Sequence, residues 1–565
     1  MVQSGAPVRV GNSLDWRLVG GWLAVAVVAC WFRLWQLGTQ LVFDDEWHPL
    51  HTLIRTGYLG IFKSFGHADH SIPLTLLFQL AADTVGLNEW SFRLLPLAFG
   101  LLTVIAVPRL LCGWMDRYER LLLGGLLAVA PLLIYFSRQA RPYAIVGLLV
   151  LAALVFLWRM TDRGQRRWGG AFVACAVPAA WLHPLSLAFT GPALIWIAGR
   201  ELLHGRQTGF WRPLVLVAVT GAVTAAACVA LLAWPVINDF ESLAVKTGIH
   251  RIEPVTLLVA WQLFIGSGNW VVALVMAGLV VHGAVLLARR DPDFSAYLAF
   301  VAVAAAVLVW LPDAEWIHHG LVLARYLAVL QLLALALIAL SLVGIGRWIS
   351  DRYAPPAAMA ACAAGILALL VWLGPLPEIH RGQNALTGHL YYQFDYDPRR
   401  NLVRRFLDTA VVPEVYGRIA AEPGDGAVIE AGWHFESHFN PLVRYQPVHG
   451  RPMKIGMITG LCAHSTWGEL PLPRAGLNFS RFIHLSELAA APGAGDFLVF
   501  HRESALPDVR ELPDVAPCIE AFRDRLGEPW YDDGRVVVFD LRGPAQAGVA
   551  TSAFGANRMA SQSTM

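Results

Sequence analysis

Two groups of polar residues have the types and the spacing that could support catalysis. The first is an acidic run, Asp44-Asp45-Glu46, which directly follows a long apolar stretch and is followed by His48. Asp69 and His70 lie further along the same polar segment. Charged side chains beside a membrane are costly unless they are solvated or used. A carboxylate within hydrogen-bond reach of a hydroxyl group can act as a general base, and this is the role that the acidic run suggests.

The acidic run also has two other interpretations. Aspartate is a common N-cap residue, so any one of these carboxylates could begin a helix or lie in a solvated loop. Carboxylate and imidazole groups could also bind a divalent cation, and the candidate ligands are then Asp45, His48, Asp69 and His70. Their spacing is not that of a dedicated metal motif. We therefore predict that no cofactor is required and keep a divalent cation as the alternative.

The second group is basic and consists of two segments with arginine and tyrosine. Ser137-Arg138-Gln139-Ala140-Arg141-Pro142-Tyr143 carries two arginines, and Arg325-Tyr326 repeats the pattern. An arginine at a helix end can simply extend its charged head to the membrane surface. A guanidinium group also matches phosphate oxygens, and fixed arginines stabilise the charge that develops on a leaving phosphate. Together the two groups predict transfer from a phosphate-linked donor to a hydroxyl group.

Long apolar runs must position these residues. The chain has 565 residues, of which 56% are hydrophobic and 15% are charged. A helix needs about 20 apolar residues to cross a bilayer, and by this measure we predict a polytopic α-helical membrane protein with about eleven spans. They are residues 18–37, 92–112, 121–136, 143–158, 169–183, 185–198, 213–234, 270–287, 297–311, 322–343 and 357–373.

The loops between these runs differ in charge. Arginines gather in alternate loops, at 117–120, 159–167, 200–212, 289–290 and 347–352, and basic loops face the cytoplasm. We therefore predict a multi-pass protein of the bacterial inner membrane, with its N-terminus in the cytoplasm and its active groups facing the periplasm. Arg33 and Arg93, at outer helix ends, are predicted to be interfacial anchors.

The apolar pattern ends near Gly374. We predict a transmembrane catalytic domain over residues 1–374, with the first periplasmic loop at 38–91. Short apolar runs alternate with polar stretches over 375–543, which predicts a periplasmic α/β domain. Residues 544–565 are rich in Ala, Ser and Gly and are predicted to be disordered. Outside the cytoplasm, Cys462 and Cys518 can form a disulfide bond.

The location of the site restricts its partners. The net charge of +2 gives no indication of a nucleic-acid partner. Nucleotide-linked sugars are made in the cytoplasm, and the chain has neither a Walker loop nor a GxGxxG motif that opens a βαβ unit. An outward-facing site therefore predicts a lipid-linked donor, with membrane lipids around the protein.

These segments resemble the GT-C superfamily of membrane glycosyltransferases. The resemblance is to the family 39 type, which includes protein O-mannosyltransferases, aminoarabinose transferases and RgtA/B/C/D-like enzymes. Asp45-Glu46-Trp47-His48 resembles the Asp-Glu-x-His that opens their first outer loop. The segment from Asp69 to Leu74 is similar to their Asp-x-His-Pro-Pro-Leu, with one residue inserted and one proline missing. Residues 137–143 and 324–327 are also similar to segments of bacterial members.

The resemblance implies a GT-C fold and an inverting transferase. Such an enzyme moves a sugar from a polyprenyl-phosphate-linked donor to a hydroxyl-bearing acceptor, which is a glycolipid, a lipopolysaccharide, a polysaccharide or a protein. Asp45 is then the catalytic base, with Glu46 and Asp44 beside it. The resemblance further implies substrate or phosphate contacts by Arg138, Arg141, Tyr143, Arg325, Tyr326, His48, Asp69, His70 and His183.

Two alternative functions remain at this point. One is a metal-dependent enzyme of the same architecture, as the oligosaccharyltransferases are. The other is a secondary transporter, but transporters usually place their coupling charges near the middle of the membrane on broken helices. The charges in this chain are instead predicted to lie in outer loops.

Overall fold

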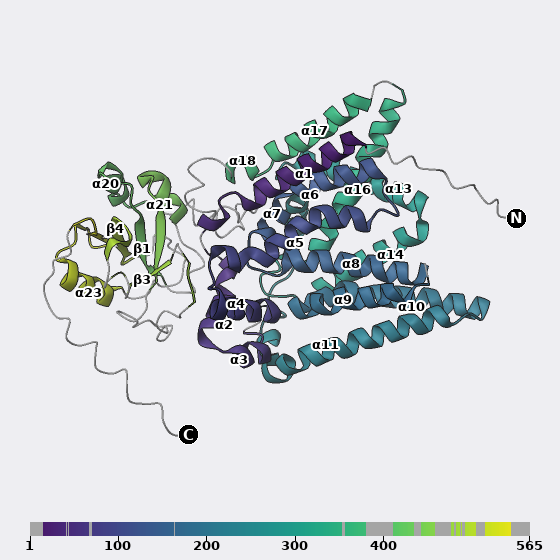
Figure 1. Cartoon of the computed structure of the whole chain (residues 1–565), viewed down its shortest axis with the longest axis horizontal. Coiled ribbons are helices and arrows are strands. Elements are labelled where there is room, and N and C mark those ends of the chain that lie inside the picture. The colour runs from purple at the N-terminus through teal and green to yellow at the C-terminus, as the bar shows by residue number, and fades with distance from the viewer. Residues whose placement is uncertain are drawn as a thin grey trace. The chain divides into compact units, whose positions relative to one another are not determined.

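The computed structural model divides the chain into two compact units. It describes residues 15–40, 42, 44–66, 71–162, 164–352, 356–379, 411–433, 442–457, 476–479, 482–485, 488, 492–503 and 515–543. The first unit comprises Met1–Asp408 and Ala475–Asn478, and the second comprises Thr409–Arg474 and Phe479–Met565 (Figure 1). The predicted tail at 544–565 lies outside the described residues.

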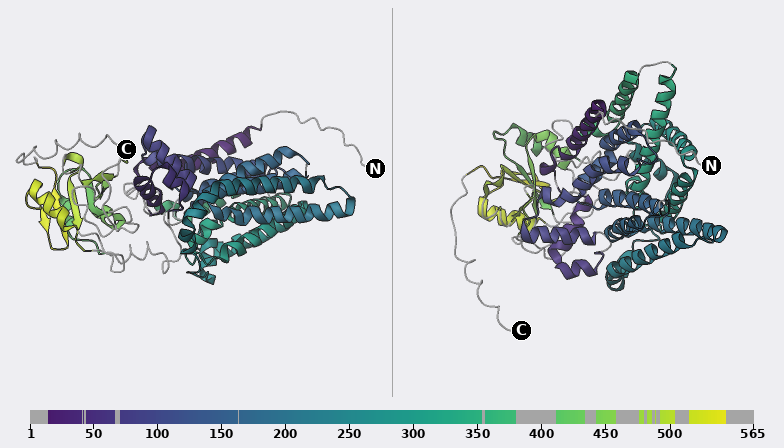
Figure 2. Two further views of the ribbon diagram at one scale, coloured as in Figure 1. Left: turned by 90° about the horizontal axis from the view of Figure 1, so that it is seen from below. Right: turned by 45° about the vertical axis from the view of Figure 1, so that its right-hand side comes forward.

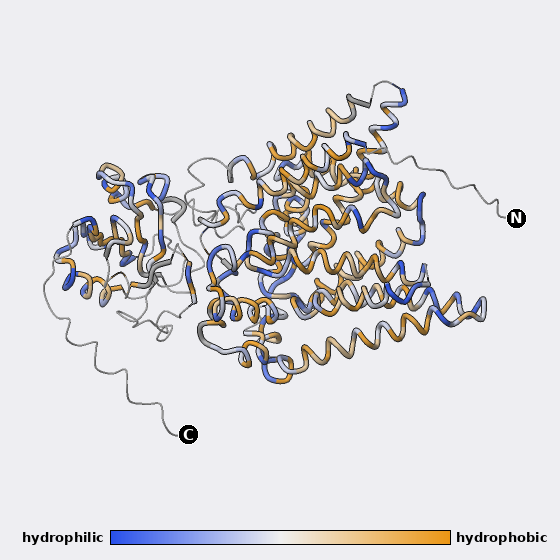
Figure 3. Tube along the Cα trace, viewed as in Figure 1, coloured by the Kyte–Doolittle hydropathy of each residue, from blue (hydrophilic) through white to orange (hydrophobic). Residues whose placement is uncertain are grey.

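The first unit is a bundle of long helices that run side by side (Figure 2). Orange, apolar residues cover most of their length, and blue, polar residues gather toward their ends (Figure 3). Seven helices are long and apolar enough to cross a membrane: α1 (Trp16–Leu34), α5 (Glu89–Leu110), α8 (Tyr143–Asp162), α11 (Arg212–Ala244), α13 (Trp270–Arg290), α14 (Pro292–Trp310) and α16 (Ala328–Ser350). The polytopic helical fold is confirmed, whereas the number of about eleven spans stays a prediction.

Shorter helices complete the bundle. They are α2 (Trp47–Arg55), α3 (Tyr58–Lys63), α4 (Ile72–Thr84), α6 (Arg117–Val129), α7 (Pro131–Ser137), α9 (Arg166–Leu182), α10 (Leu187–Thr208), α12 (Pro254–Ile265), α15 (Gly320–Tyr326), α17 (Pro356–Trp372) and α18 (Leu376–Ile379). Three of them, α2 to α4, occupy much of the predicted first outer loop. Residues 38–91, which were predicted to form the first outer loop, are therefore largely helical.

Two predicted spans are broken. The run 121–136 forms α6 and α7, which meet at 63°, and the run 322–343 is divided at Leu327 into α15 and α16. Each of these two runs forms two helices, because a run of apolar residues indicates length but not straightness. The second break leaves Arg325 and Tyr326 on a short helix of their own.

The break between α6 and α7 has a local chemical cause. Pro131 has no backbone N–H, so the carbonyl of Leu127 loses the donor that a continuous helix would supply. Arg33 of α1 replaces it: its guanidinium donates to the carbonyl oxygens of Leu127 and Ala128, each at 3.0 Å. Arg33 is fully buried, so its predicted role as an interfacial anchor was wrong. It satisfies backbone groups that a membrane would otherwise leave without partners.

The second unit contains a six-stranded sheet in the order β3-β2-β1-β4-β6-β5. The strands β1 (Val428–Trp433), β2 (Met453–Met457), β3 (Phe482–His484) and β4 (Phe497–His501) are parallel, and β6 (Val536–Asp540) runs antiparallel to β4 and to β5 (Tyr531–Asp532). Parallel strands need cover on both faces. Helix α23 (Ala516–Leu526) covers one face through Ile519 and Phe522.

The other face of the sheet carries polar side chains that are bonded to each other. Tyr416 of α20 (Val415–Ala421) donates to Glu430 at 2.7 Å and lies 3.0 Å from the Nε2 of His501. Tyr445 of α21 (Leu442–His449) stacks on Tyr416. The small mixed sheet domain that the sequence predicted is thus confirmed. Cys518 is disulfide-bonded, while its predicted partner, Cys462, lies outside the described residues.

A short late segment belongs to the first unit. Leu87 donates to the carbonyl of Gly476 and accepts from the N–H of Asn478, both at 2.7 Å, in a parallel bridge. Gly476 has a φ of +91°, and a Cβ atom there would lie 2.0 Å from the carbonyl oxygen of Ala82. Only glycine fits at this crossing.

The role of Arg33 can be tested by replacing it with an apolar side chain of similar length. We expect Arg33→Met to lower the thermal unfolding temperature in detergent, because two buried carbonyls lose their donor at about 1–3 kcal/mol each. The control is Arg17→Met, since Arg17 lies exposed on the same helix. Equal unfolding temperatures for the two variants would contradict the assignment.

Candidate active site

The acidic run is held in place by Glu46. It forms the 3-10 helix η2 (Asp44–Glu46), in which successive side chains point in directions about 120° apart. Glu46 is fully buried and accepts from Arg93 of α5, with Nε–Oε1 at 2.8 Å and Nη2–Oε2 at 2.6 Å. It also accepts from the backbone N–H of Ala140 at 2.7 Å. Glu46 is therefore placed as a supporting residue, and Arg93 is a buried partner rather than the predicted interfacial anchor.

Arg138 belongs to a second supporting network. Its Nε donates to the side-chain oxygen of Gln40 at 3.2 Å, and its Nη1 donates to the carbonyl of Arg33 at 2.9 Å. Gln40 donates in return to the carbonyl of Arg138 at 3.0 Å. Arg138 is fully buried and satisfies a carbonyl at the end of α1. The structure does not place Arg138 against the carboxylate of Asp45.

Asp45 points away from Glu46 and meets two arginines. Its Oδ2 is in direct contact with the Nη1 of Arg325 and lies 3.6 Å from the Nη2 of Arg141. Its Oδ1 lies 3.6 Å from the Nε2 of His48. The side chains of Asp45, His48, Arg141 and Arg325 are between 10% and 19% exposed, so each keeps a small exposed area. One carboxylate thus faces two guanidinium groups that come from distant parts of the chain.

Aromatic rings surround the arginines. The guanidinium of Arg325 lies 5.3 Å from the ring centre of Tyr143 and 5.2 Å from that of Tyr326. The Nη2 of Arg141 lies 3.4 Å from the hydroxyl of Tyr143. The ring of His183 lies between the two tyrosines, at 5.7 Å and 5.6 Å. Stacked cations of this kind keep their charge while part of their hydration is replaced by ring faces.

The electrostatics of the cluster favour an ionised Asp45. Burial opposes its ionisation, but the charges of Arg325 and Arg141 and a hydrogen bond from His48 outweigh burial and hold the pKa of this carboxyl group well below its usual range. Asp45 is therefore charged at physiological pH. While both arginines hold it, the carboxylate is also a weak base.

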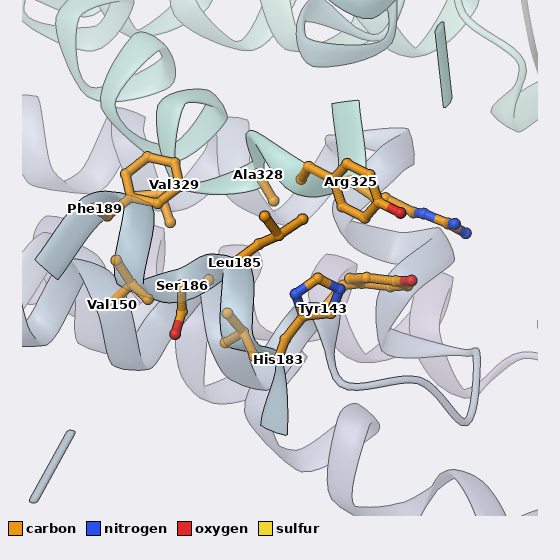
Figure 4. Close-up of a pocket in the computed structure, with 12 residues that line it drawn as sticks. Tyr143, Val150, His183, Leu185, Ser186, Phe189, Arg325, Ala328 and Val329 are labelled. Carbon is orange, nitrogen blue, oxygen red and sulfur yellow. The ribbon is translucent and has the colours of Figure 1, made fainter. Parts of the chain in front are cut away.

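A cleft leads away from Arg325 between α8, α10 and α16. Its lining changes from polar to apolar along its length (Figure 4): Tyr143, His183 and Arg325 lie at one end, and Val150 and Phe189 lie toward the other. The side chain of Leu185 lies between the two ends (Figure 4). A site for a small ligand typically combines an apolar lining with a few placed polar groups, and this cleft shares that lining although its volume is only about 20 Å³.

The predicted site residues fall into three sets. The structure brings together Asp45, His48, Arg141, Tyr143, His183, Arg325 and Tyr326. It buries Glu46 and Arg138 behind them. The side chain of Asp44, and Asp69 and His70 entirely, lie outside the described residues. The chemical roles of all of these residues stay predictions.

Some residues of the site were missed in the sequence. Gln40 gives no signal that distinguishes it from other polar loop residues. Arg33 and Arg93 do give one, because a charge within an apolar run is expected to turn toward the protein interior. The apolar lining residues of the cleft, such as Leu185 and Phe189, look like any other residue of a span.

The described part of the site fits an anion better than a cation. No group of three or more His, Cys, Asp or Glu that could hold a metal ion occurs among the described residues. Asp45, one of the candidate ligands, faces two guanidinium groups. A cation placed there would be repelled by both.

Comparisons with known proteins return structures but no sequence family. No family model and no curated protein matches the chain. ArnT from Cupriavidus metallidurans in the apo state is 14% identical, with a TM-score of 0.45 over 93% of this chain and 99% of that chain. The same protein bound to undecaprenyl phosphate is 15% identical, with a TM-score of 0.45 over 94% of this chain and 100% of that chain. An oligosaccharyltransferase from Archaeoglobus fulgidus is 10% identical, with a TM-score of 0.41 over 86% of this chain and 70% of that chain. With scores below 0.5, these similarities carry no argument about activity.

The supporting role of Glu46 leads to a stability prediction. Glu46→Gln keeps the shape of the side chain but leaves Arg93 as a buried charge without its counter-ion. Breaking a buried ion pair costs about 3–5 kcal/mol, so we expect a clear fall in the thermal unfolding temperature. Glu241→Gln, at an exposed carboxylate of α11, is the matched control. A Glu46→Gln variant as stable as this control would show that the pair does not hold the acidic run.

Proposed function

We propose that the protein is a glycosyltransferase of the GT-C type, which transfers a sugar from a polyprenyl-phosphate-linked donor to a hydroxyl-bearing acceptor with inversion. The observation that carries the proposal is the contact of one solvent-accessible carboxylate, Asp45, with two arginines at the polar end of an apolar cleft. The acceptor classes are a glycolipid, a lipopolysaccharide, a polysaccharide and a protein.

The charges of the cluster match such a donor. Asp45, Arg141 and Arg325 together carry a net charge of +1 when His48 is neutral. A lipid phosphodiester carries one negative charge, so its complex with the cluster is neutral. When the sugar leaves, the phosphate gains a second negative charge while Asp45 takes the proton of the acceptor hydroxyl. The complex stays neutral, which favours the reaction in a site with little water.

The cleft supports a lipid as the carrier of the phosphate. A phosphate on Arg325 would leave the first isoprene units beside Leu185, Val150 and Phe189, which are apolar. Tyr143, Tyr326 and His183 then lie beside the phosphate and the sugar, where they can position both. The proposed location is the inner membrane of a bacterium, with the N-terminus in the cytoplasm and the cluster facing the periplasm.

The central test is the variant Asp45→Asn. It keeps the size of the side chain but removes the base, and we expect transfer to fall by about 10²–10⁴-fold while a donor phosphate still binds. The measurement is the release of polyprenyl phosphate in proteoliposomes that contain lipid-linked sugar and acceptor. Asp293→Asn, at an exposed carboxylate of α14, serves as the control. Full activity in Asp45→Asn would exclude Asp45 as the base.

We further propose that transfer needs no divalent cation, because two guanidinium groups supply the positive charge that a metal would otherwise provide. The expected result is unchanged transfer after exhaustive treatment with EDTA and after later addition of Mg²⁺ or Mn²⁺. Loss of activity on chelation, with recovery on addition of one of these ions, would favour the metal-dependent alternative.

A further inference from the structure

Asp45 occupies the arginine atoms that a phosphate needs. The Nη1 of Arg325 and the Nη2 of Arg141 both approach the same carboxylate oxygen, Oδ2. These are the donors that the proposed function assigns to the donor phosphate. The same two guanidinium groups would therefore bind two different anions, the donor phosphate and the carboxylate of Asp45. In this structure they contact Asp45.

We propose that the donor phosphate displaces Asp45 from Arg141 and Arg325, so that the carboxylate becomes a competent base only while the donor is bound. This inference rests on the proposed function and adds to it a coupling between donor binding and base strength. Displacement removes the two positive charges that stabilise the ionised carboxylate, and the affinity of Asp45 for a proton rises accordingly.

Few other charged groups near Asp45 could stabilise its ionised form in place of the two arginines. Arg325 approaches it from α15, Arg141 from the segment before α8, and His48 from α2. Glu46 points away and is neutralised by Arg93. Tyr143 and Tyr326 contact the arginines. Once the arginines turn to a phosphate, His48 is the titratable group that remains on the carboxylate among the described residues.

Arg325 is built to change partners. Its buried Nε has no hydrogen-bond partner among the described residues, so a donor is free for a phosphate oxygen. Besides a hydrogen bond with Tyr326, its guanidinium lies over the rings of Tyr143 and Tyr326, and a ring face, unlike a hydrogen bond, does not fix the direction of the remaining nitrogens. Arg93 differs, because Glu46 binds it through two hydrogen bonds at 2.8 Å and 2.6 Å.

The transfer step balances in atoms and charge. The acceptor oxygen forms a bond to the anomeric carbon, and the bond from that carbon to the phosphate oxygen breaks. Its electron pair stays on the phosphate, whose new charge is met by Arg141 and Arg325. The proton of the acceptor hydroxyl goes to Asp45, which the arginines no longer hold.

The first test compares two pH profiles of the wild-type protein in proteoliposomes at saturating acceptor. The profile of kcat/KM for the donor reports the free enzyme, and that of kcat reports the donor complex. We expect the acid limb of kcat to lie more than about one pH unit above that of kcat/KM. If the acid limbs of the two profiles coincide, the displacement of Asp45 by the donor phosphate is overturned and the proposed function stays intact. If no transfer occurs at any pH, the proposed function itself is overturned.

The second test removes the competing anion and measures binding without chemistry. Farnesyl phosphate, a short prenyl phosphate, is titrated calorimetrically into wild type, Asp45→Asn and the control Asp293→Asn at one pH and salt concentration. We expect Asp45→Asn to bind about tenfold more tightly than the other two. Equal or weaker binding by a variant that unfolds at the wild-type temperature would overturn the proposal.

Discussion

The ion pair between Glu46 and Arg93 anchors the two segments that carry Asp45 and Arg141. Arg93 comes from a long helix of the bundle, so the pair ties the acidic run to a rigid element. Glu46 also accepts from the backbone of Ala140, one residue before Arg141. The same carboxylate thus sets both Asp45 and Arg141, and their contact follows from it. Both partners are fully buried, where the attraction is least screened and the loss of one partner is most costly.

Neighbouring residues of the same type divide structural and chemical tasks. Asp45 and Glu46 are adjacent acids, yet one is accessible and the other is enclosed. Arg138 and Arg141 show the same division, with the first bonded to Gln40 and to a helix end and the second turned toward Asp45. A buried network of Glu46, Arg93, Gln40 and Arg138 thus lies behind the partly exposed pair of Asp45 and Arg141.

The sequence was sufficient for the coarse architecture and for the meeting of Asp45 with Arg141 and Arg325. Span length and alternation of apolar residues predict a helical bundle and a mixed sheet domain. The sequence could not separate Glu46 from Asp45, because a turn of one residue decides which side chain enters the interior. Pro131 did mark the break between α6 and α7, because proline ends or kinks a helix, whereas nothing in the apolar composition marks the break at Leu327. Arg33 was misassigned because its partners, the carbonyls of Leu127 and Ala128 at the break before Pro131, belong to another helix.

The bridge between Leu87 and the segment 476–478 has a consequence for how the chain can be divided. The chain passes between the two units three times, at 408/409, 474/475 and 478/479. A truncation at 408/409 would remove the sheet unit and also the segment 476–478, whose backbone is hydrogen-bonded to Leu87 of the helical unit. A cut after residue 478 would leave only β1 and β2 of the sheet, because β3 to β6 follow it in the sequence. The two units are therefore compact but not separable modules, and their borders are poor places for a fusion or a domain exchange.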